Sequence, residues 1–181
     1  MATIFTRIAQ GEIPSYKVAE NEDYYAFLDI SPLTLGHTLV IPKHVEDDYI
    51  FHLDAPVYDG LWAFARKVAV ALKAAVPCKR VGVAVLGMEV PHTHIHLVPL
   101  QTEGDLDFRK TRPQVTKEQM AQTAAAILAE YEKLQEAPRA RPGGARAGCL
   151  RRQGAHQGYP GRRTRPADRG QAAGSQYLPR P

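Results

Sequence analysis

The sequence has little cysteine and no long run of apolar residues. Its 181 residues include only two cysteines, Cys78 and Cys149. Two isolated cysteines cannot build the disulfide framework of a small secreted domain. No apolar stretch approaches the roughly 20 residues of a membrane-spanning helix, and charged Arg7 and Glu12 interrupt the N-terminal apolar residues, unlike in a signal peptide. We therefore expect a cytoplasmic protein that does not enter the membrane.

Acidic residues are almost absent from the last quarter of the chain. Residues 137–181 hold ten arginines, eight glycines and six prolines but one acid, Asp168. Residues 1–136 hold 13 Lys and Arg against 18 Asp and Glu, so the net charge of +4 comes from the end of the chain. A mildly acidic part lacks the broad basic surface of a nucleic-acid-binding protein. The change predicts a folded domain over 1–136 followed by a tail over 137–181.

The tail is expected to be disordered. It contains no Ile, Val, Phe or Met, so it cannot bury enough apolar area to offset an ordering entropy of roughly 1–2 kcal/mol per residue. An Arg- and Gly-rich segment can bind nucleic acid weakly through its phosphates. The alternative is an extension without function, such as an out-of-frame translation of a GC-rich gene. We favour this alternative, because the composition changes abruptly after a complete helix.

Short strands that follow one another along the chain characterise residues 1–136. Cap residues predict helices that begin after Thr3, Asp54 and Thr116. Strands that mostly neighbour other strands indicate an α+β fold with an antiparallel sheet. Apolar patterns bounded by turn residues predict five strands, over 16–20, 23–28, 37–41, 81–86 and 92–99.

Histidines occupy every second position from His92 to His96. In a strand, successive side chains point to opposite faces, so the three imidazoles are expected on one face. Ile95 and Leu97 are then expected to point into the core. Three rings that repel one another when protonated would rarely be kept together as filler, so the pattern indicates a functional site.

Three interpretations of this histidine pattern are open. The first is a solvated strand at the edge of the sheet, which the apolar flanking residues oppose. The second is a Zn²⁺ site, which needs further ligands, and Glu89 is the only acid close in sequence. The third is nucleophilic catalysis on phosphorus, in which an imidazole nitrogen forms a phosphoramidate and the other rings orient it and donate hydrogen bonds. This third chemistry needs no metal or other cofactor.

The segment 92–98 resembles the His-φ-His-φ-His-φ-φ signature of the histidine-triad (HIT) superfamily, with Thr93 as a departure at the first φ position. The resemblance covers roughly residues 3–136. Four more segments resemble the Hint-like branch of that superfamily, in order and at about the expected spacing: 4–8, 11–14, 26–32 and 36–43.

The resemblance implies a five-stranded antiparallel α+β fold that pairs as a homodimer with a continuous ten-stranded sheet. It implies nucleotidyl transfer to the middle histidine, His94, and then hydrolysis by water. His96 would contact the phosphate and leaving group, His92 and His37 would buttress the site, and Asp29 would bind the ribose hydroxyls. A slot for a purine base would be apolar and formed by Ile4, Phe5, Ile8 and Phe27.

These residues also have simpler interpretations. Asp29 follows an apolar strand and precedes a proline loop, where a ribose contact and a loop cap are equally well supported. For the four apolar residues, plain core packing is the stronger interpretation. His37 taken alone is more typical of a hydrogen-bonded core histidine.

The segment before the triad departs from the Hint-like branch, whose members carry a longer segment with an Asn and a Ser near the phosphate. Here no Asn matches, and Glu89 stands where the Ser would fall, so we place Glu89 among the substrate-contacting residues. We expect hydrolysis of a nucleoside 5′-phosphoramidate or a related nucleoside phosphate ester or anhydride. The alternatives are a dinucleoside polyphosphate hydrolase and a nucleotide-binding or interaction module with residual activity.

Overall fold

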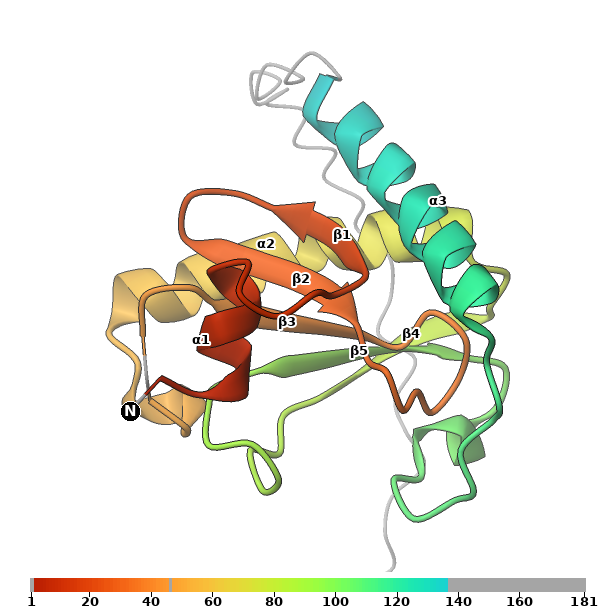
Figure 1. Ribbon diagram of the computed structural model, residues 1–181, viewed down its shortest axis with the longest axis horizontal. Coiled ribbons are helices and arrows are strands. Elements are labelled where there is room, and N and C mark those ends of the chain that lie inside the picture. Colours follow the sequence, from red (N-terminus) through yellow and green to blue (C-terminus); the bar gives the residue numbers. More distant parts are fainter. Residues whose placement is uncertain (1, 46, 137–181) are drawn as a thin grey trace, which may run out of the picture. The chain divides into compact units, whose positions relative to one another are not determined.

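The computed structural model describes residues 2–45 and 47–136, so the expected tail over 137–181 lies outside the described residues. No helix in these two ranges is both long and apolar enough to cross a membrane. The elements, in chain order, are α1 (Ile4–Ala9), β1 (Lys17–Glu20), β2 (Tyr24–Leu28), β3 (Thr38–Pro42), the 3₁₀ helix η1 (Ile50–His52), α2 (Ala55–Ala75), β4 (Arg80–Ala84), β5 (Ile95–Leu100), the 3₁₀ helix η2 (Glu103–Leu106) and α3 (Lys117–Glu136) (Figure 1).

The five strands form one antiparallel sheet in the order β1-β2-β3-β5-β4. β5 therefore lies inside the sheet, between β3 and β4. In this register Leu39 of β3 and Ala84 of β4 are both opposite His96 of β5. The predicted α+β fold with a five-stranded antiparallel sheet is confirmed.

One face of the sheet packs against α2 and α3. Figure 1 shows α2 behind the strands and α1 in front of them. The buried side chains of α2 recur every three or four residues, at Leu61, Phe64, Val68 and Leu72, as an amphipathic helix requires. They share one apolar core with side chains from every second strand position, including Val18, Ala26, Leu28, Val40, Ile95 and Leu97.

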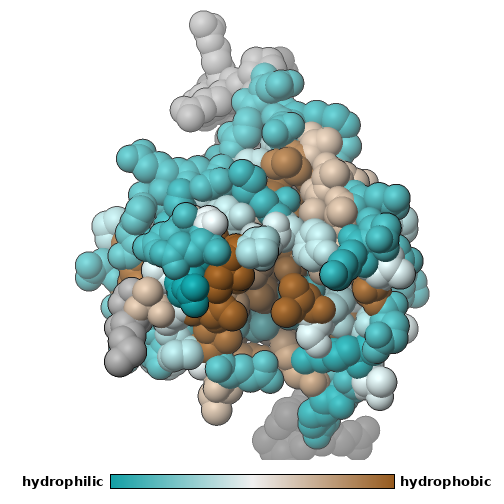
Figure 2. All heavy atoms as spheres, in the orientation of Figure 1, coloured by the Kyte–Doolittle hydropathy of each residue, from teal (hydrophilic) through white to brown (hydrophobic). Residues whose placement is uncertain are grey.

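The opposite face carries a smaller apolar cluster under α1. Phe5 and Ile8 of α1 pack there on Tyr25, Phe27, Leu39 and Ile41 of β2 and β3. A six-residue helix is not stable alone, so this packing and the Thr3 cap hold it. In Figure 2 hydrophobic residues gather near the centre of this face, surrounded by hydrophilic ones.

The strand that carries the histidines begins later than the pattern predicts. β5 starts at Ile95, so His92 and His94 precede the strand instead of belonging to it. The reason is where the backbone hydrogen bonds go. His92 N–H donates to the Val90 carbonyl at 2.8 Å, and Thr93 N–H donates to the Asp47 carbonyl at 2.7 Å, instead of to a neighbouring strand. The expectation of three histidines in one strand was wrong.

Other boundaries differ by one or two residues. β4 ends at Ala84 rather than at 86, and β3 runs from Thr38 to Pro42 rather than from 37 to 41. The chain leaves the sheet after β4 and turns at Gly87, whose φ of +70° is in the region that favours glycine. At the last helix, Thr116 and Gln119 form the predicted capping box.

Candidate active site

His94 is held by a hydrogen bond that decides which of its nitrogens is free. Its Nδ1 lies 2.6 Å from the backbone carbonyl oxygen of His92. A carbonyl only accepts, so His94 Nδ1 carries the proton and the lone pair of the neutral ring is on Nε2. Burial lowers the pKa of His94, although the His92 carbonyl and the charges of Asp29 and Glu89 oppose the shift. The ring is therefore neutral at physiological pH, with Nε2 as a potential nucleophile.

His37 and His96 form a buried pair whose protons are ordered in the same way. The backbone N–H of Leu33 donates to His37 Nδ1 at 3.1 Å. The neutral His37 ring therefore has its proton on Nε2, which lies 3.0 Å from His96 Nδ1 and donates to it. His96 must in turn carry its proton on Nε2. The result is a hydrogen-bond donor at His96, next to the lone pair of His94.

Both rings of this pair are neutral. Burial is the largest cause that lowers the pKa of His37 to about 3. Repulsion from His96 and His94 in their protonated forms, and from Arg112, acts in the same direction. Burial, followed by repulsion from the protonated form of His94 and from Arg112, lowers the pKa of His96 to about 3. The His94 and His96 ring centroids are 4.7 Å apart, a distance that suits neutral rings.

His92 connects the site to the N-terminal helix. Its Nε2 lies 3.0 Å from the Pro42 carbonyl oxygen and donates to it, so Nδ1 accepts from the Thr3 hydroxyl at 3.0 Å. The same Thr3 oxygen accepts the N–H of Thr6 at 3.1 Å and caps α1. His92 is fully buried. Its carbonyl orients His94, so one residue ties the cap of α1 to the central ring.

A cleft of about 110 Å³ opens beside His94 and His96. The two acids on its wall, Asp29 and Glu89, were both expected at the site. Glu89 is exposed, which allows its carboxylate to turn toward solvent. The nine lining residues are Asp29, Leu86, Gly87, Met88, Glu89, His94, His96, Phe108 and Arg112.

Asp29 has one oxygen committed to the loop and one near the histidines. Its Oδ1 accepts the N–H of Ser31 at 2.8 Å, which is the loop-cap geometry. Its Oδ2 lies 3.5 Å from His37 Nδ1. That nitrogen already accepts the Leu33 N–H, and His37 is neutral, so the contact is not an ion pair. Burial raises the pKa of Asp29, while the Ser31 amide and the charge of Arg112 oppose the shift.

The four apolar residues expected to bind a base lie apart from the cleft lining. Phe5, Ile8 and Phe27 are buried in the cluster under α1, whereas Ile4 is 51% exposed. The Phe5 ring lies edge-on to both Phe27, at 5.5 Å between centroids, and His94, at 5.2 Å. These contacts are those of core packing, with Phe5 also supporting the His94 ring.

Five residues of the cleft lining were not predicted as site residues: Leu86, Gly87 and Met88, which precede the triad, and Phe108 and Arg112, which follow it. The Phe108 ring lies edge-on to His96 at 5.0 Å between centroids and to His37 at 6.4 Å. The guanidinium carbon of Arg112 is 5.9 Å from the centre of the Phe108 ring. Phe108 is the lone aromatic residue in the polar stretch 101–116, which is a weak signal. Nothing in the pattern distinguishes Arg112 from its basic neighbours.

Three ligand-type side chains come close enough to meet at a metal ion. Single ligand atoms of Asp29, His37 and His96 lie within 4.8 Å of one another, and no other such group occurs in the described part of the chain. The grouping differs from the zinc alternative, which combined the triad with Glu89. Both ring nitrogens of His37 already take part in hydrogen bonds, so a metal ion would have to displace one of them.

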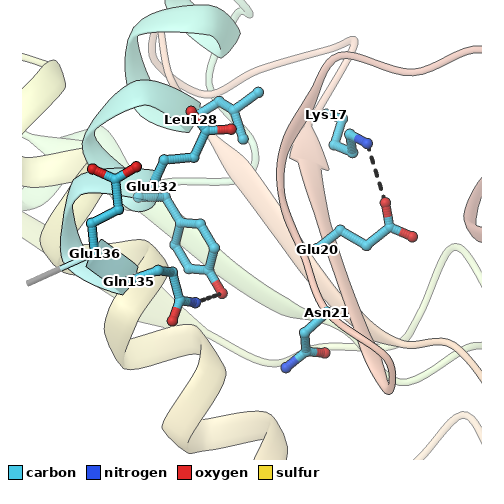
Figure 3. A pocket seen from close by; sticks show the side chains of 8 residues that line it. Lys17, Glu20, Asn21, Leu128, Glu132, Gln135 and Glu136 are labelled. Carbon is cyan, nitrogen blue, oxygen red and sulfur yellow. Dashed lines mark hydrogen bonds and ion pairs between the residues drawn. The ribbon is translucent and has the colours of Figure 1, made fainter. Parts of the chain in front are cut away.

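A larger hollow lies away from the histidines, between β1 and α3 (Figure 3). It measures about 740 Å³, and its lining residues are Lys17, Glu20, Asn21, Leu128, Tyr131, Glu132, Gln135 and Glu136. Some of its polar groups bind each other: Lys17 Nζ is 3.2 Å from Glu20 Oε2, and Gln135 Nε2 donates to the Tyr131 hydroxyl at 2.8 Å. It holds no ordered set of nucleophile and donors, so we assign the chemistry to the smaller cleft.

Comparison with known proteins finds one family and structures of the same fold. The HIT domain family matches residues 10–103. An uncharacterized HIT-like protein of Borreliella burgdorferi is 36% identical over 114 residues, which cover 59% of this chain and 81% of that protein. An adenosine 5′-monophosphoramidase of Saccharomyces cerevisiae is 36% identical over 103 residues, covering 56% of this chain and 65% of that protein. The crystal structure of a zinc-bound histidine triad family protein from Mycobacterium smegmatis is 27% identical, with a TM-score of 0.63, and covers 76% of this chain and 99% of that one.

Proposed function

Because the chain belongs to the HIT domain family, we propose that it is a nucleotide hydrolase or transferase that uses His94 as a covalent nucleophile. Membership of the family supports this broad class of activity. The narrower proposal is attack on the α-phosphate of a nucleoside 5′-phosphoramidate or a related nucleoside phosphate. In this narrower proposal, the residues that line the cleft of this chain contact the substrate.

One observation carries the proposal: His94 is held as a neutral ring with its lone pair on Nε2. The bond from His94 Nδ1 to the His92 carbonyl fixes that tautomer. The adjacent His96 presents a proton on Nε2, because His37 donates to its Nδ1. A nucleophile beside a preorganised donor is the arrangement that displacement at phosphorus needs.

The reaction then has two displacements at one phosphorus atom. His94 Nε2 forms a bond to the α-phosphorus, and the bond from phosphorus to the leaving group breaks. An amine leaving group departs with the electron pair of that bond and takes one proton from solvent. Water next attacks the nucleotidyl-histidine, which releases a nucleoside monophosphate and a proton and restores the neutral His94. Throughout, His96 Nε2 donates a hydrogen bond to the phosphate or leaving group.

The size of the cleft supports a contact with the phosphate end of the substrate. Its volume of about 110 Å³ is below the roughly 300–1,000 Å³ of pockets that enclose a small-molecule ligand. The ribose and base would therefore lie largely outside it. In this proposal Asp29 Oδ2 binds the ribose hydroxyls, His92 and His37 hold the two reacting rings, and the base rests near the cluster under α1.

The substrate class is tested by measuring turnover on a panel of an adenosine 5′-phosphoramidate, a diadenosine polyphosphate and a nucleotide sugar. The phosphoramidate is expected to be the best substrate, as the name of the yeast relative suggests for that protein. A preference for the diadenosine compound would instead support the dinucleoside polyphosphate alternative. Binding of nucleotide without turnover of any member would replace both by a binding module.

We also propose that the chain pairs with a second copy. β4 is an edge strand. Val83 on β4 is 44% exposed, and Val70 on α2 is 49% exposed. An exposed strand edge beside apolar side chains is suited to isologous pairing, which would join two five-stranded sheets into one of ten. Light scattering at micromolar concentration is expected to give the mass of a dimer. The mass of a monomer would reject the pairing.

A further inference from the structure

Arg112 is the only lysine or arginine among the nine described residues that line the cleft. It lies in the segment between β5 and α3, twenty residues in sequence from the start of the triad. The other charged residues of the lining, Asp29 and Glu89, are acids. The three neutral imidazoles of His37, His94 and His96 add hydrogen-bonding groups but no positive charge. Among the described residues of the lining, a phosphate that enters the cleft therefore meets one permanent cation.

The guanidinium of Arg112 has hydrogen-bond donors that lack a close acceptor. Its Nη1 is buried and has no hydrogen-bond partner among the residues that the structure describes. Its Nη2 is 3.5 Å from the Phe108 carbonyl oxygen, a long contact. A buried donor without an acceptor is costly and is rare in folded proteins. An anionic ligand in the cleft would supply the acceptor, and guanidinium groups match phosphate oxygens in geometry and charge.

The neighbouring Arg109 has a different environment. Its side chain is 92% exposed, and its Nε is 3.2 Å from Asp107 Oδ1. Arg109 is absent from the cleft lining. The two arginines are three residues apart on one segment, so Arg109 serves as a matched control for Arg112.

The charge of Arg112 acts on one side of the site. It contributes to the lowered pKa of His37 and of His96 and opposes the raised pKa of Asp29. Acids, rather than Arg112, account for the charge effects at His94. Together with its contact to Phe108, which itself packs on His96, this places the guanidinium beside His96, on the flank of the nucleophile.

We propose that Arg112 binds the phosphate oxygens of the substrate beside His96 and supplies the positive charge that the cleft otherwise lacks. This role rests on the proposed function, since it takes a nucleotide as the ligand. The positive charge of Arg112 also offsets the repulsion expected between Glu89 and the phosphate. Arg112 forms no covalent bond, and its part is to hold the anion while His94 attacks.

The test compares the binding of adenosine, AMP and ADP by calorimetry to the full chain and to Arg112→Met, Arg112→Lys and Arg109→Met. In Arg112→Met, AMP or ADP is expected to bind about tenfold more weakly or worse, with adenosine within about twofold. An equal loss for AMP and ADP indicates the α-phosphate, and a loss for ADP alone indicates a second phosphate. Arg112→Lys should recover part of the loss, and Arg109→Met should match the unaltered protein.

Three results would count against the proposal in distinguishable ways. Equal affinities of Arg112→Met and the unaltered protein for AMP and for ADP would overturn the role of Arg112 alone. So would a similar loss for adenosine and both nucleotides, since that indicates a structural effect, which the melting temperature of each variant would also reveal. Failure of the unaltered protein to bind AMP or ADP would overturn the proposed function along with it.

Discussion

The two faces of the sheet differ in what they bury. The face toward α2 and α3 buries apolar side chains from β1, β2, β3, β5 and both helices, among them Ile95 and Leu97 of β5. The face toward α1 buries fewer apolar residues and gathers the four histidines. His94 and His96 alternate with Ile95 and Leu97 along the chain, so one short segment contributes to both.

This difference separates stability from chemistry. A close-packed apolar face holds the backbone in place. Because its side chains do not titrate near neutral pH, its contribution to the free energy of unfolding depends little on pH. The other face buries four imidazoles, each with directed hydrogen bonds. His94, just before β5, and Ile95, its first residue, should therefore respond to substitution in opposite ways. The following predictions test that division from the largest expected effect to the smallest.

His94→Ala is expected to lower turnover by more than about 10⁴-fold, because it removes the nucleophile itself and not merely a proton-transfer group. Nucleotide binding should persist, since Asp29, Arg112 and the cluster under α1 remain. Steady-state rates with the phosphoramidate and binding of AMP measure the two effects separately. Substantial turnover by the folded variant would contradict the assignment of the nucleophile.

Ile95→Ala is expected to have the opposite profile. Ile95 is fully buried between the sheet and the helices, and truncation of such a side chain typically costs about 2–5 kcal/mol of unfolding free energy. The folded fraction should keep most of its turnover per molecule. Denaturant unfolding and active-site titration of the same sample check both. A stable Ile95→Ala protein with abolished activity would break the proposed division of the two faces.

The histidine face is expected to make stability depend on pH. His37 and His96 have a pKa of about 3 in the folded protein, against about 6.5 in an unfolded chain. Between these values the unfolded chain binds more protons, so unfolding free energy is lost as pH falls from about 6.5 toward 3. For the two rings the loss from pH 7 to pH 5 is about 2–4 kcal/mol.

Denaturant unfolding at a series of pH values measures this dependence. His37→Asn removes one titrating ring while its side-chain oxygen can still accept the Leu33 N–H. Its stability should vary less steeply with pH than that of the unaltered protein. A flat profile for the unaltered protein between pH 7 and pH 5 would show that these imidazoles are not held neutral.

The smallest effect is expected at the link between α1 and the triad. Thr3→Ala removes the cap of α1 and the hydroxyl that donates a hydrogen bond to His92. The expected cost is about 1 kcal/mol of unfolding free energy. Thr3→Ser keeps both hydrogen bonds and serves as the control. The melting temperature and kcat of the two variants provide the measurements. Equal behaviour of the two variants would mean that the hydroxyl contributes nothing to either face.

Local patterns were enough to predict much of the fold. Cap residues correctly placed the starts of α1, α2 and α3, and the alternation around Ile95 correctly predicted that its side chain points into the core. The start of β5 was missed because Thr93 N–H bonds to the Asp47 carbonyl, a contact between distant segments. A period of two describes side-chain direction, but it does not say whether the backbone is paired with another strand.

The candidate site likewise contains residues that the sequence predicted and residues that it did not. The motif and the resemblance drew attention to the four histidines and Asp29, which the structure brings together. Phe108 and Arg112 could not be located, because a loop's sequence does not determine where the loop returns. The same holds for the bond from Thr3 to His92, which joins residues 89 positions apart.

Trapping the covalent intermediate tests the central claim most directly. Enzyme quenched during turnover of an adenosine 5′-phosphoramidate labelled in the adenosine should carry an acid-labile adenylyl group. Peptide mapping under alkaline conditions is predicted to place that label on His94, and His94→Ala should carry none. A label on any other residue, or turnover with no label on the quenched enzyme, would contradict covalent catalysis by His94.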